Sequence, residues 1–318
     1  MRKFLAGTLR QSLEAWIILA KLTVPALILV RLLMWFGLVG YISMPFEPIM
    51  GLIGLPKEMA LVWVSAMLTN NYTGVIVFLN VMPVAGPLSV SQATILGTII
   101  LIAHNLPVEC GVCRGAGVSP LRVTVLRLLA AILFGFLANK ICLAFGWGLS
   151  EAQCVITFAA DPVPPWGTWA IVNVKSLAAI FLIVWVLVLL MALMRRIGLI
   201  GLITFLLAPL MRVSGVGRKA TMITIIGMVL GLAYGGGLII AESRSGNIPR
   251  ADIYSSITLM ALCHSLLEDT IILASLGGSL WGLLVGRLAF AVLLAGLIVR
   301  AARRPLGKAI LVGKKYYA

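Results

Sequence analysis

Hydrophobic residues in this 318-residue chain gather in eight long segments, which short stretches rich in Gly, Pro and charged residues separate. The segments run roughly over 15–42, 58–81, 88–118, 121–144, 169–194, 220–241, 251–279 and 281–302. An apolar segment of about 20 residues can cross the roughly 30 Å hydrocarbon core of a bilayer as an α-helix. The pattern therefore predicts an all-α, polytopic membrane protein.

The first half of the pattern returns in the second half at a spacing of about 160 residues. The run 104–109, His-Asn-Leu-Pro-Val-Glu, corresponds without a gap to 264–269, His-Ser-Leu-Leu-Glu-Asp, and Arg127 corresponds to Arg287. The chain's two histidines thus occupy matching positions. Self-similarity of this length is typical of an internal structural repeat. We place the first repeat at 1–145 and the second at 169–304.

Composition supports the membrane interpretation and changes how the net positive charge is interpreted. Hydrophobic residues make up 61% of the chain and charged residues 11%, about half the charged fraction of an average soluble domain. The net charge of +15 would fit a nucleic-acid partner, but the basic residues gather at the N-terminus, near 114–122, over 195–219 and from 300 to 315. The positive-inside rule makes these four clusters cytoplasmic. We expect the lipid bilayer and no nucleic acid as partner, both termini in the cytoplasm, and a basic tail at 305–318.

The stretch 146–168 has no Lys or Arg, carries two acids and is rich in Pro, so we assign it as an external linker. Each half then contains an odd number of crossings, and the two repeats are inverted. Since each half has four segments, one does not cross. We expect the third, 88–118 and 251–279, to be a re-entrant hairpin, because it carries the histidine motif and mid-segment Gly and Pro. The predicted fold has two inverted repeats with about six transmembrane helices and two re-entrant hairpins. The alternative is eight crossings with parallel repeats.

The second segment of each half is also interrupted. Polar residues and glycines fall near the centre of these apolar helices, where Gly lowers helix stability and Asn competes for backbone hydrogen bonds. Secondary transporters use broken helices in matching places of two inverted repeats to hold substrate and coupling ions. For the glycines after Tyr234, close helix packing is the alternative. The candidate substrate-binding residues here are Asn70, Asn71, Tyr72, Thr73 and Tyr234.

Ionisable side chains in the histidine motifs are the main candidates for chemistry. A charge at the centre of a membrane helix costs at least about 2.5–3.5 kcal/mol, so such residues are usually paired, face a cavity or act in function. A histidine and a carboxylate that converge across a turn could take up and release a proton near neutral pH. Alternatively, the histidines cap the hairpin backbone and the two arginines neutralise the acids as buried ion pairs. The candidates for substrate binding or coupling are His104, Asn105, Glu109, His264, Ser265, Glu268 and Asp269, and those for an ion pair or gate are Arg127 and Arg287.

Cys110 and Cys113 form a Cys-x-x-Cys pair directly after Glu109. With the nearby histidine they could bind a soft metal such as Fe(II) or Zn(II). The second repeat has no matching thiols. Five cysteines, an odd number in a membrane setting, imply no disulfide framework.

The apolar segment that ends in His-Asn-Leu-Pro-Val-Glu, followed by Cys- and Gly-rich sequence and an Arg-containing helix, resembles the nucleoside recognition or "gate" domain. That domain occurs in concentrative nucleoside transporters, bacterial ferrous-iron permeases and spore maturation proteins, and the resemblance covers both halves. It implies a permease-like fold in a bacterial inner membrane. It does not imply nucleosides as substrate, and this chain lacks the Gly-rich GTPase loop of the iron permeases.

These observations favour an ion-coupled secondary permease of a small polar solute, with its site between two hairpin tips at the midplane. The alternatives are a divalent-metal permease and a non-transporting membrane partner protein. Enzyme function is disfavoured, because the chain has no Gly-x-Gly-Asp-like loop, Ser nucleophile elbow or His-Glu-x-x-His motif. We expect no cofactor. Partners left open are a small molecule or ion as substrate, a second copy of the chain and a second membrane subunit.

Overall fold

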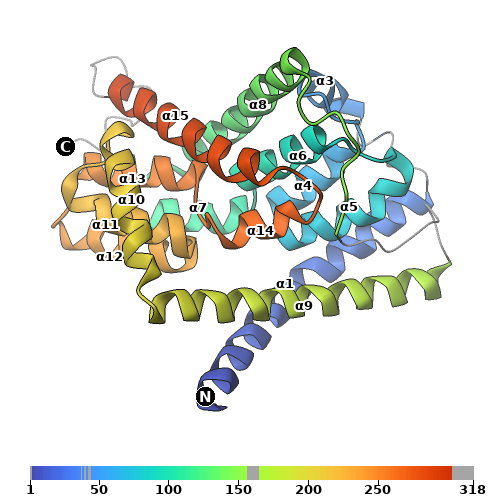
Figure 1. Ribbon diagram of the computed structural model, residues 1–318, viewed down its shortest axis with the longest axis horizontal. Coiled ribbons are helices and arrows are strands. Elements are labelled where there is room, and N and C mark those ends of the chain that lie inside the picture. Colours follow the sequence, from blue (N-terminus) through green and yellow to red (C-terminus); the bar gives the residue numbers. More distant parts are fainter. Residues whose placement is uncertain (1, 37, 39–40, 42–43, 156–164, 303–318) are drawn as a thin grey trace.

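The computed structural model describes residues 2–36, 38, 41, 44–155 and 165–302, and these form a helical bundle (Figure 1). Its only β-type pairing within those residues is a single bridge between Ser89 and Glu151. The predicted tail 305–318 and residues 156–164 of the predicted linker lie outside the described residues.

The first half contains α1 (Arg2–Trp35), η1 (Met44–Phe46), α3 (Glu47–Leu52), α4 (Met59–Leu68), α5 (Asn71–Ala85), α6 (Val90–Ile102), α7 (Leu106–Gly115) and α8 (Pro120–Phe145). The second contains α9 (Trp166–Arg196), α10 (Leu199–Val213), α11 (Arg218–Leu230), α12 (Leu232–Ser245), α13 (Arg250–Leu262), α14 (Glu268–Ala274), η2 (Trp281–Gly286) and α15 (Arg287–Ala302).

Helices α4 and α5 form a hairpin with its tip at Asn70. The backbone of Asn70 is extended, with φ −165°, and its side chain accepts a hydrogen bond from the backbone N–H of Thr73, which starts α5 as an N-cap. The two arms can lie close together because Gly74 faces Ala66: a Cβ at Gly74 would lie 2.9 Å from the Ala66 Cβ. A short polar turn and a small-residue contact thus reverse the chain.

Helices α11 and α12 form the second hairpin, which turns at Gly231. Its φ of +83° is a conformation that residues with a Cβ rarely adopt. A Cβ on Gly235 would lie 2.2 Å from the Gly227 Cα, so these arms approach even more closely. The prediction that the second segments are broken helices is therefore wrong, because the chain folds back at both places.

The third segments do not fold back, and the prediction of hairpins at 88–118 and 251–279 is wrong. Helices α6 and α7 lie in different parts of the bundle, joined by a break at 103–105 (Figure 1), and together they form one apolar run of 26 residues, Val90–Gly115. Asn105 at this break has φ +51°, and Ser265 at the break between α13 and α14 has φ +47°. Pro107 lies in the first turn of α7, where its missing N–H costs no helical hydrogen bond. The Gly and Pro residues of these segments predicted that the helix is interrupted, but not whether the chain continues or folds back at the interruption.

The two broken helices lie antiparallel and meet at their breaks. Helix α6 packs against α14, while α7 and α13 line one small cavity together. Each hairpin also reaches across to the other half, since α5 packs on α14 and α12 packs on α7. An inverted repeat requires an arrangement of this kind. Each half thus contains one hairpin and one broken helix, and the odd number of crossings in each half stays a prediction.

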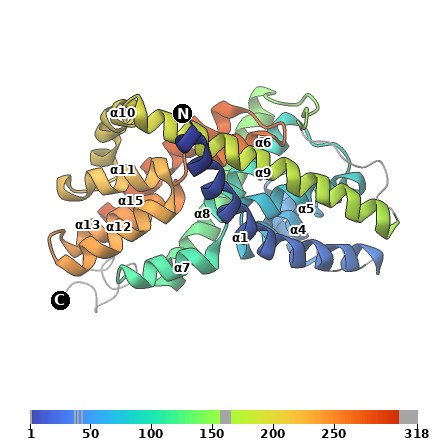
Figure 2. The same ribbon diagram turned by 90° about the horizontal axis from the view of Figure 1, so that it is seen from below.

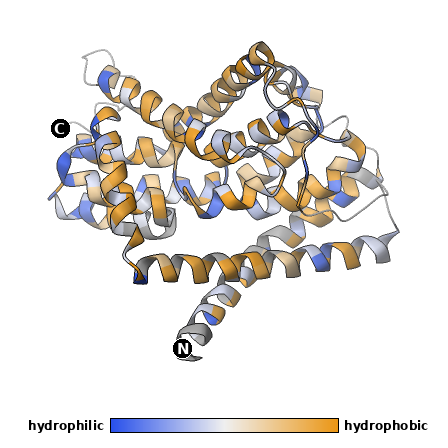
Figure 3. Cartoon of the chain, viewed as in Figure 1, coloured by the Kyte–Doolittle hydropathy of each residue, from blue (hydrophilic) through white to orange (hydrophobic). Residues whose placement is uncertain are grey.

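Four described helices are long and apolar enough to cross a membrane: Val90–Gly115, Pro120–Phe145, Trp166–Met194 and Trp281–Ala302. In the most apolar part of the first, 61% of residues are buried inside the protein, against 13% in α9, so the broken helix is central and α9 peripheral. Figure 3 shows hydrophobic residues along most of α9. Helix α1 crosses α9 on the outside of the bundle (Figure 2), where the Trp16 indole donates a hydrogen bond to the Leu177 carbonyl.

Candidate functional site

The two histidines meet where the broken helices cross. Their ring centroids lie 4.9 Å apart and their Nε2 atoms 3.2 Å apart. In each ring the other nitrogen, Nδ1, lies at hydrogen-bond distance from a backbone carbonyl four residues earlier: 3.0 Å from Ile100 O for His104 and 2.9 Å from Met260 O for His264. The two repeats thus contribute the same local structure, and the sequence interpretation of the histidines as backbone caps agrees with these bonds.

These bonds determine how the two rings face each other. A carbonyl oxygen can only accept, so each Nδ1 carries a hydrogen and donates it. A neutral imidazole with hydrogen on Nδ1 presents a lone pair at Nε2. Two lone pairs then face each other across 3.2 Å in a buried space. A positive ion or a proton at this place would remove the repulsion.

Carboxylates from both halves approach the histidine pair. Glu109 Oε1 lies 3.5 Å from His264 Nε2, and Asp269 Oδ2 lies 3.6 Å from His104 Nε2. The shortest histidine–carboxylate contacts therefore join the halves instead of staying within one motif. His104, His264 and Glu109 hold one ligand atom each within 4.8 Å of one another, a grouping that could bind a metal ion.

The two arginines are bound differently. Arg127 Nη1 forms an ion pair with Glu109 Oε2 at 2.5 Å, and its Nε donates to the Ile102 carbonyl at 2.6 Å. Arg287 donates to Thr270 Oγ1 at 3.4 Å and has no ion pair with a carboxylate of the described residues. The predicted buried ion pair is thus present in the first half, while no arginine among the described residues forms an ion pair with Asp269.

The first hairpin brings its tip to this cluster. Tyr72 donates a hydrogen bond from its hydroxyl to Glu268 Oε1 at 3.1 Å, and the Asn71 side chain hydrogen-bonds Asp269. Asn70 and Thr73 instead bond each other and shape the tip itself. The sequence-predicted residues of this hairpin therefore divide into two that touch the acids and two that hold the turn.

The second hairpin reaches the cluster through Ser265. A Cβ on Gly231 would lie 2.6 Å from Ser265 Oγ, so the tip touches the break of the second broken helix. Tyr234 lies in the first turn of α12, and its side chain lies outside what the structure describes. Asn105 adopts its left-handed conformation without capping α7 through its side chain.

The two cysteines stand apart from the histidines. Cys110 Sγ lies 3.3 Å from Thr124 Oγ1 on α8. Cys113 is buried and lines a small cavity with Glu109, Ile257 and Met260. Among the described residues, the group of mutually close ligand atoms contains no thiol.

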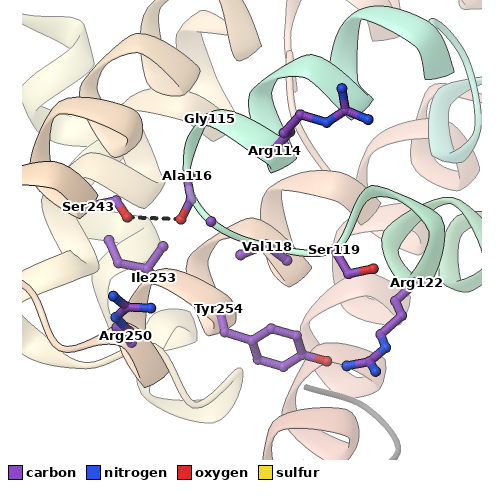
Figure 4. Close-up of a pocket in the computed structure, with 11 residues that line it drawn as sticks. Arg114, Gly115, Ala116, Val118, Ser119, Arg122, Ser243, Arg250, Ile253 and Tyr254 are labelled. Atoms are coloured by element: carbon purple, nitrogen blue, oxygen red, sulfur yellow. Dashed lines mark hydrogen bonds between the residues drawn. The ribbon is translucent and has the colours of Figure 1, made fainter. Parts of the chain in front are cut away.

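A larger cavity of about 160 Å³ opens at the far end of α7 (Figure 4). Its lining includes three arginines, Arg114, Arg122 and Arg250, together with Ser243 and Tyr254. Figure 4 shows the Tyr254 ring pointing toward the Arg122 guanidinium. In the sequence, Arg114 and Arg122 indicated topology alone, and no prediction was attached to Arg250. The three arginines are scattered along the sequence, so their meeting at the ends of helices was not evident from it.

The basic cavity leads toward the histidines along α13. Ile253 lines the basic cavity, Ile257 and Met260 line the small cavity beside Glu109, and His264 follows. Ile253, Ile257 and Met260 are spaced by three or four residues and so share one face of α13, and His264 lies just beyond the end of that helix. At the other end of the broken helices, a cavity of about 410 Å³ is lined by α5, the loop before α6 and residues 151–154, with Glu151 as its charged residue. The buried cluster thus lies between two cavities of opposite charge.

Comparison with known proteins agrees with the apolar spans. The chain is 28% identical over 301 residues, which are 92% of each chain, to "Uncharacterized membrane protein YvoD" of Bacillus subtilis (strain 168). No family model and no solved structure matches the chain. This is a multi-pass membrane protein. The resemblance to the gate domain, the inner-membrane location and the orientation of the termini remain predictions.

Proposed function

We propose that this membrane protein is an ion-coupled secondary permease in which a small polar solute or ion passes between the hairpin tips and the breaks of the two crossed helices. The observation that carries the proposal is the buried His–carboxylate cluster at the crossing, where both repeats contribute the same backbone irregularities. Irregular backbone at membrane depth is tolerated only where protein or a watery cavity covers it. Secondary transporters place their sites at such repeat interfaces.

The helix ends around the cluster support this proposal. Glu109 lies in the first turn of α7, and Glu268 and Asp269 in the first turn of α14. The partial positive charge of a helix N-terminus favours carboxylates there by about 0.3–1 kcal/mol at exposed sites and by more when partly buried. The start of α5 adds the Asn71 hydrogen bond to Asp269. Three acids can therefore remain at depth without a full set of basic partners.

The closed state of the structure also fits a gated path. Beside Glu109 there is a cavity of only about 10 Å³, distinct from the larger cavity that Arg114 lines. On the other side, Tyr72 and Asn71 cover the acids of α14. Movement of a hairpin would uncover the cluster to one cavity at a time, which is what alternating access requires.

The test is flux into liposomes that contain the purified protein. A panel of radiolabelled nucleosides, organic acids and divalent metals is offered with and without an imposed proton or sodium gradient, and at least one solute is expected to accumulate. Asp269→Asn should abolish the gradient-driven part, because the variant removes a buried carboxylate that faces His104 and has no arginine ion pair among the described residues. Glu47→Gln, which changes a half-exposed surface carboxylate, is the control. Absence of flux across the panel, or gradient-driven flux unchanged in Asp269→Asn, contradicts the proposal.

A further inference from the structure

We infer that His104, His264, Glu109 and Asp269 form a binding site for a divalent first-row transition-metal ion, and that this ion is the transported species. The transport half of this inference rests on the proposed permease function. The binding half does not, because it follows from the arrangement of the four side chains alone.

Spacing of the ligand atoms is the first argument. Zinc binds imidazole nitrogen at about 2.0–2.1 Å and carboxylate oxygen at about 2.0–2.2 Å in tetrahedral sites, which puts neighbouring ligand atoms about 3.3–3.5 Å apart. Here the two Nε2 atoms are 3.2 Å apart, and the histidine–carboxylate contacts are 3.5 and 3.6 Å. A metal ion between these atoms would need only small shifts of the side chains.

The orientation of the ligands is the second argument. In metal sites the free ring nitrogen of a ligating histidine usually donates to a carbonyl or carboxylate, which fixes the tautomer and the ring. Both histidines do so, toward Ile100 O and Met260 O. Glu109 is fixed in the same way, because Arg127 holds its Oε2 while the buried Oε1 has no hydrogen-bond partner. Both histidines and Glu109 thus present one free ligand atom each to the same space, and Asp269 Oδ2 lies 3.6 Å from His104 Nε2.

The charge of the cluster favours a cation. Glu109, Glu268 and Asp269 bring three carboxylates, against two guanidinium groups from Arg127 and Arg287. A cation between the histidines would lie next to two of these carboxylates. Two imidazoles with two carboxylates suit Zn(II), Fe(II), Co(II) or Mn(II), whereas Mg(II) and Ca(II) prefer oxygen ligands alone.

Metal titration of the purified protein in detergent tests the binding. Co(II) is the probe, because its visible absorption reports the type and geometry of the ligands, and Zn(II) binding is followed by calorimetry. We expect one ion per chain and absorption typical of nitrogen and oxygen ligands. His264→Gln and Asp269→Asn should each weaken binding by at least about tenfold. The double variant Cys110→Ser with Cys113→Ser should bind as the original chain does. Size exclusion and circular dichroism show whether each variant folds.

Three outcomes would overturn the inference. One is a folded protein that binds neither Co(II) nor Zn(II), which would leave a proton as the only ion between the histidines. Another is binding that is unchanged in both His264→Gln and Asp269→Asn. The last is thiolate-to-cobalt charge-transfer absorption that disappears in the double cysteine variant, which would place the metal at Cys110 and Cys113.

Measurement of metal uptake tests the transport claim separately from the binding claim. Proteoliposomes loaded with a fluorescent metal indicator should respond to external Zn(II) or Mn(II), and Asp269→Asn should suppress the response. Specific binding without uptake of any solute in the panel would keep the site and contradict the permease. Uptake of an organic solute by a protein that binds no metal would keep the permease and contradict the metal.

Discussion

Arg127 and Arg287 occupy matching positions and are both fully buried, yet only Arg127 forms an ion pair with a carboxylate of the described residues. The partner offered in the first half is Glu109, and in the second it is Asp269, which is one methylene shorter. A shorter side chain on the first turn of α14 extends less far from its helix. Asp269, without an arginine ion pair among the described residues, instead faces His104 and Asn71.

Removal of the two arginines should have unequal effects. Arg127→Leu is expected to lower the free energy of unfolding by about 3–5 kcal/mol, because Glu109 would remain as a buried charge without its partner. Arg287→Leu breaks no ion pair and should cost clearly less. Thermal or denaturant unfolding of both variants in the same detergent measures the difference. Equal losses would mean that the asymmetry of the ion pairs has no energetic basis.

The histidine contact could be foreseen from the sequence, but its crosswise pairing could not. Matching positions in two inverted repeats are expected to meet near the pseudosymmetry axis, and the Nε2 atoms of His104 and His264 lie 3.2 Å apart. Each histidine motif also contains its own acid, five residues later, which suggested local pairs. The structure instead turns Glu109 toward His264 and Asp269 toward His104. Such a choice depends on how the two helices cross, which no local pattern encodes.

The elements of each half differ from prediction in where the chain reverses. Both hairpin tips are flanked by small residues four positions on either side: Ala66 and Gly74 around Asn70, and Gly227 and Gly235 around Gly231. These residues let the two arms touch. No such pair flanks His104, where Ile100 lies four positions earlier. The helical segments themselves were predictable from apolar length, whereas the direction of each interruption depended on this small-residue pair.

Two glycines of α12 test the role of this pair. Gly235→Ala should destabilise the protein by about 1–3 kcal/mol, the usual cost of overpacking, since its Cβ would lie 2.2 Å from the Gly227 Cα. Gly237→Ala is the matched control in the same helix. Nothing lies within 4 Å of its Cβ, and the higher helix propensity of Ala should stabilise it by up to about 1 kcal/mol. Unfolding midpoints that do not separate the two variants would contradict the close contact of the arms.

At the scale of the whole molecule, the two predicted repeats are not separate domains. Helices α5 and α6 of the first half pack on α14, and α7 packs on α12. The sequence boundaries 1–145 and 169–304 therefore describe the repeat and not two independent bodies. The candidate site consists of residues from both halves, so neither half contains it alone.

Orientation in the membrane can be tested with single cysteines. In a variant with all five native cysteines replaced by Ser, Glu151→Cys should react with a membrane-impermeant maleimide added to intact cells. Ser245→Cys, in the exposed last turn of α12, should react only after permeabilisation. The positive-inside rule gives this orientation, because Arg114, Arg122 and Arg250 line the cavity near Ser243. Labelling in the opposite order would reverse the topology.

The opposite charges of the two cavities should attract different ions to the two mouths of the proposed permease. A cation is attracted to the mouth that Glu151 lines and repelled at the mouth that Arg114, Arg122 and Arg250 line, and charged walls in a low-dielectric setting strengthen such fields. An anion meets the reverse. Under the proposed permease function, the two mouths would therefore concentrate ions of opposite sign, so a cation would gather at the mouth that Glu151 lines and an anion at the mouth that the three arginines line.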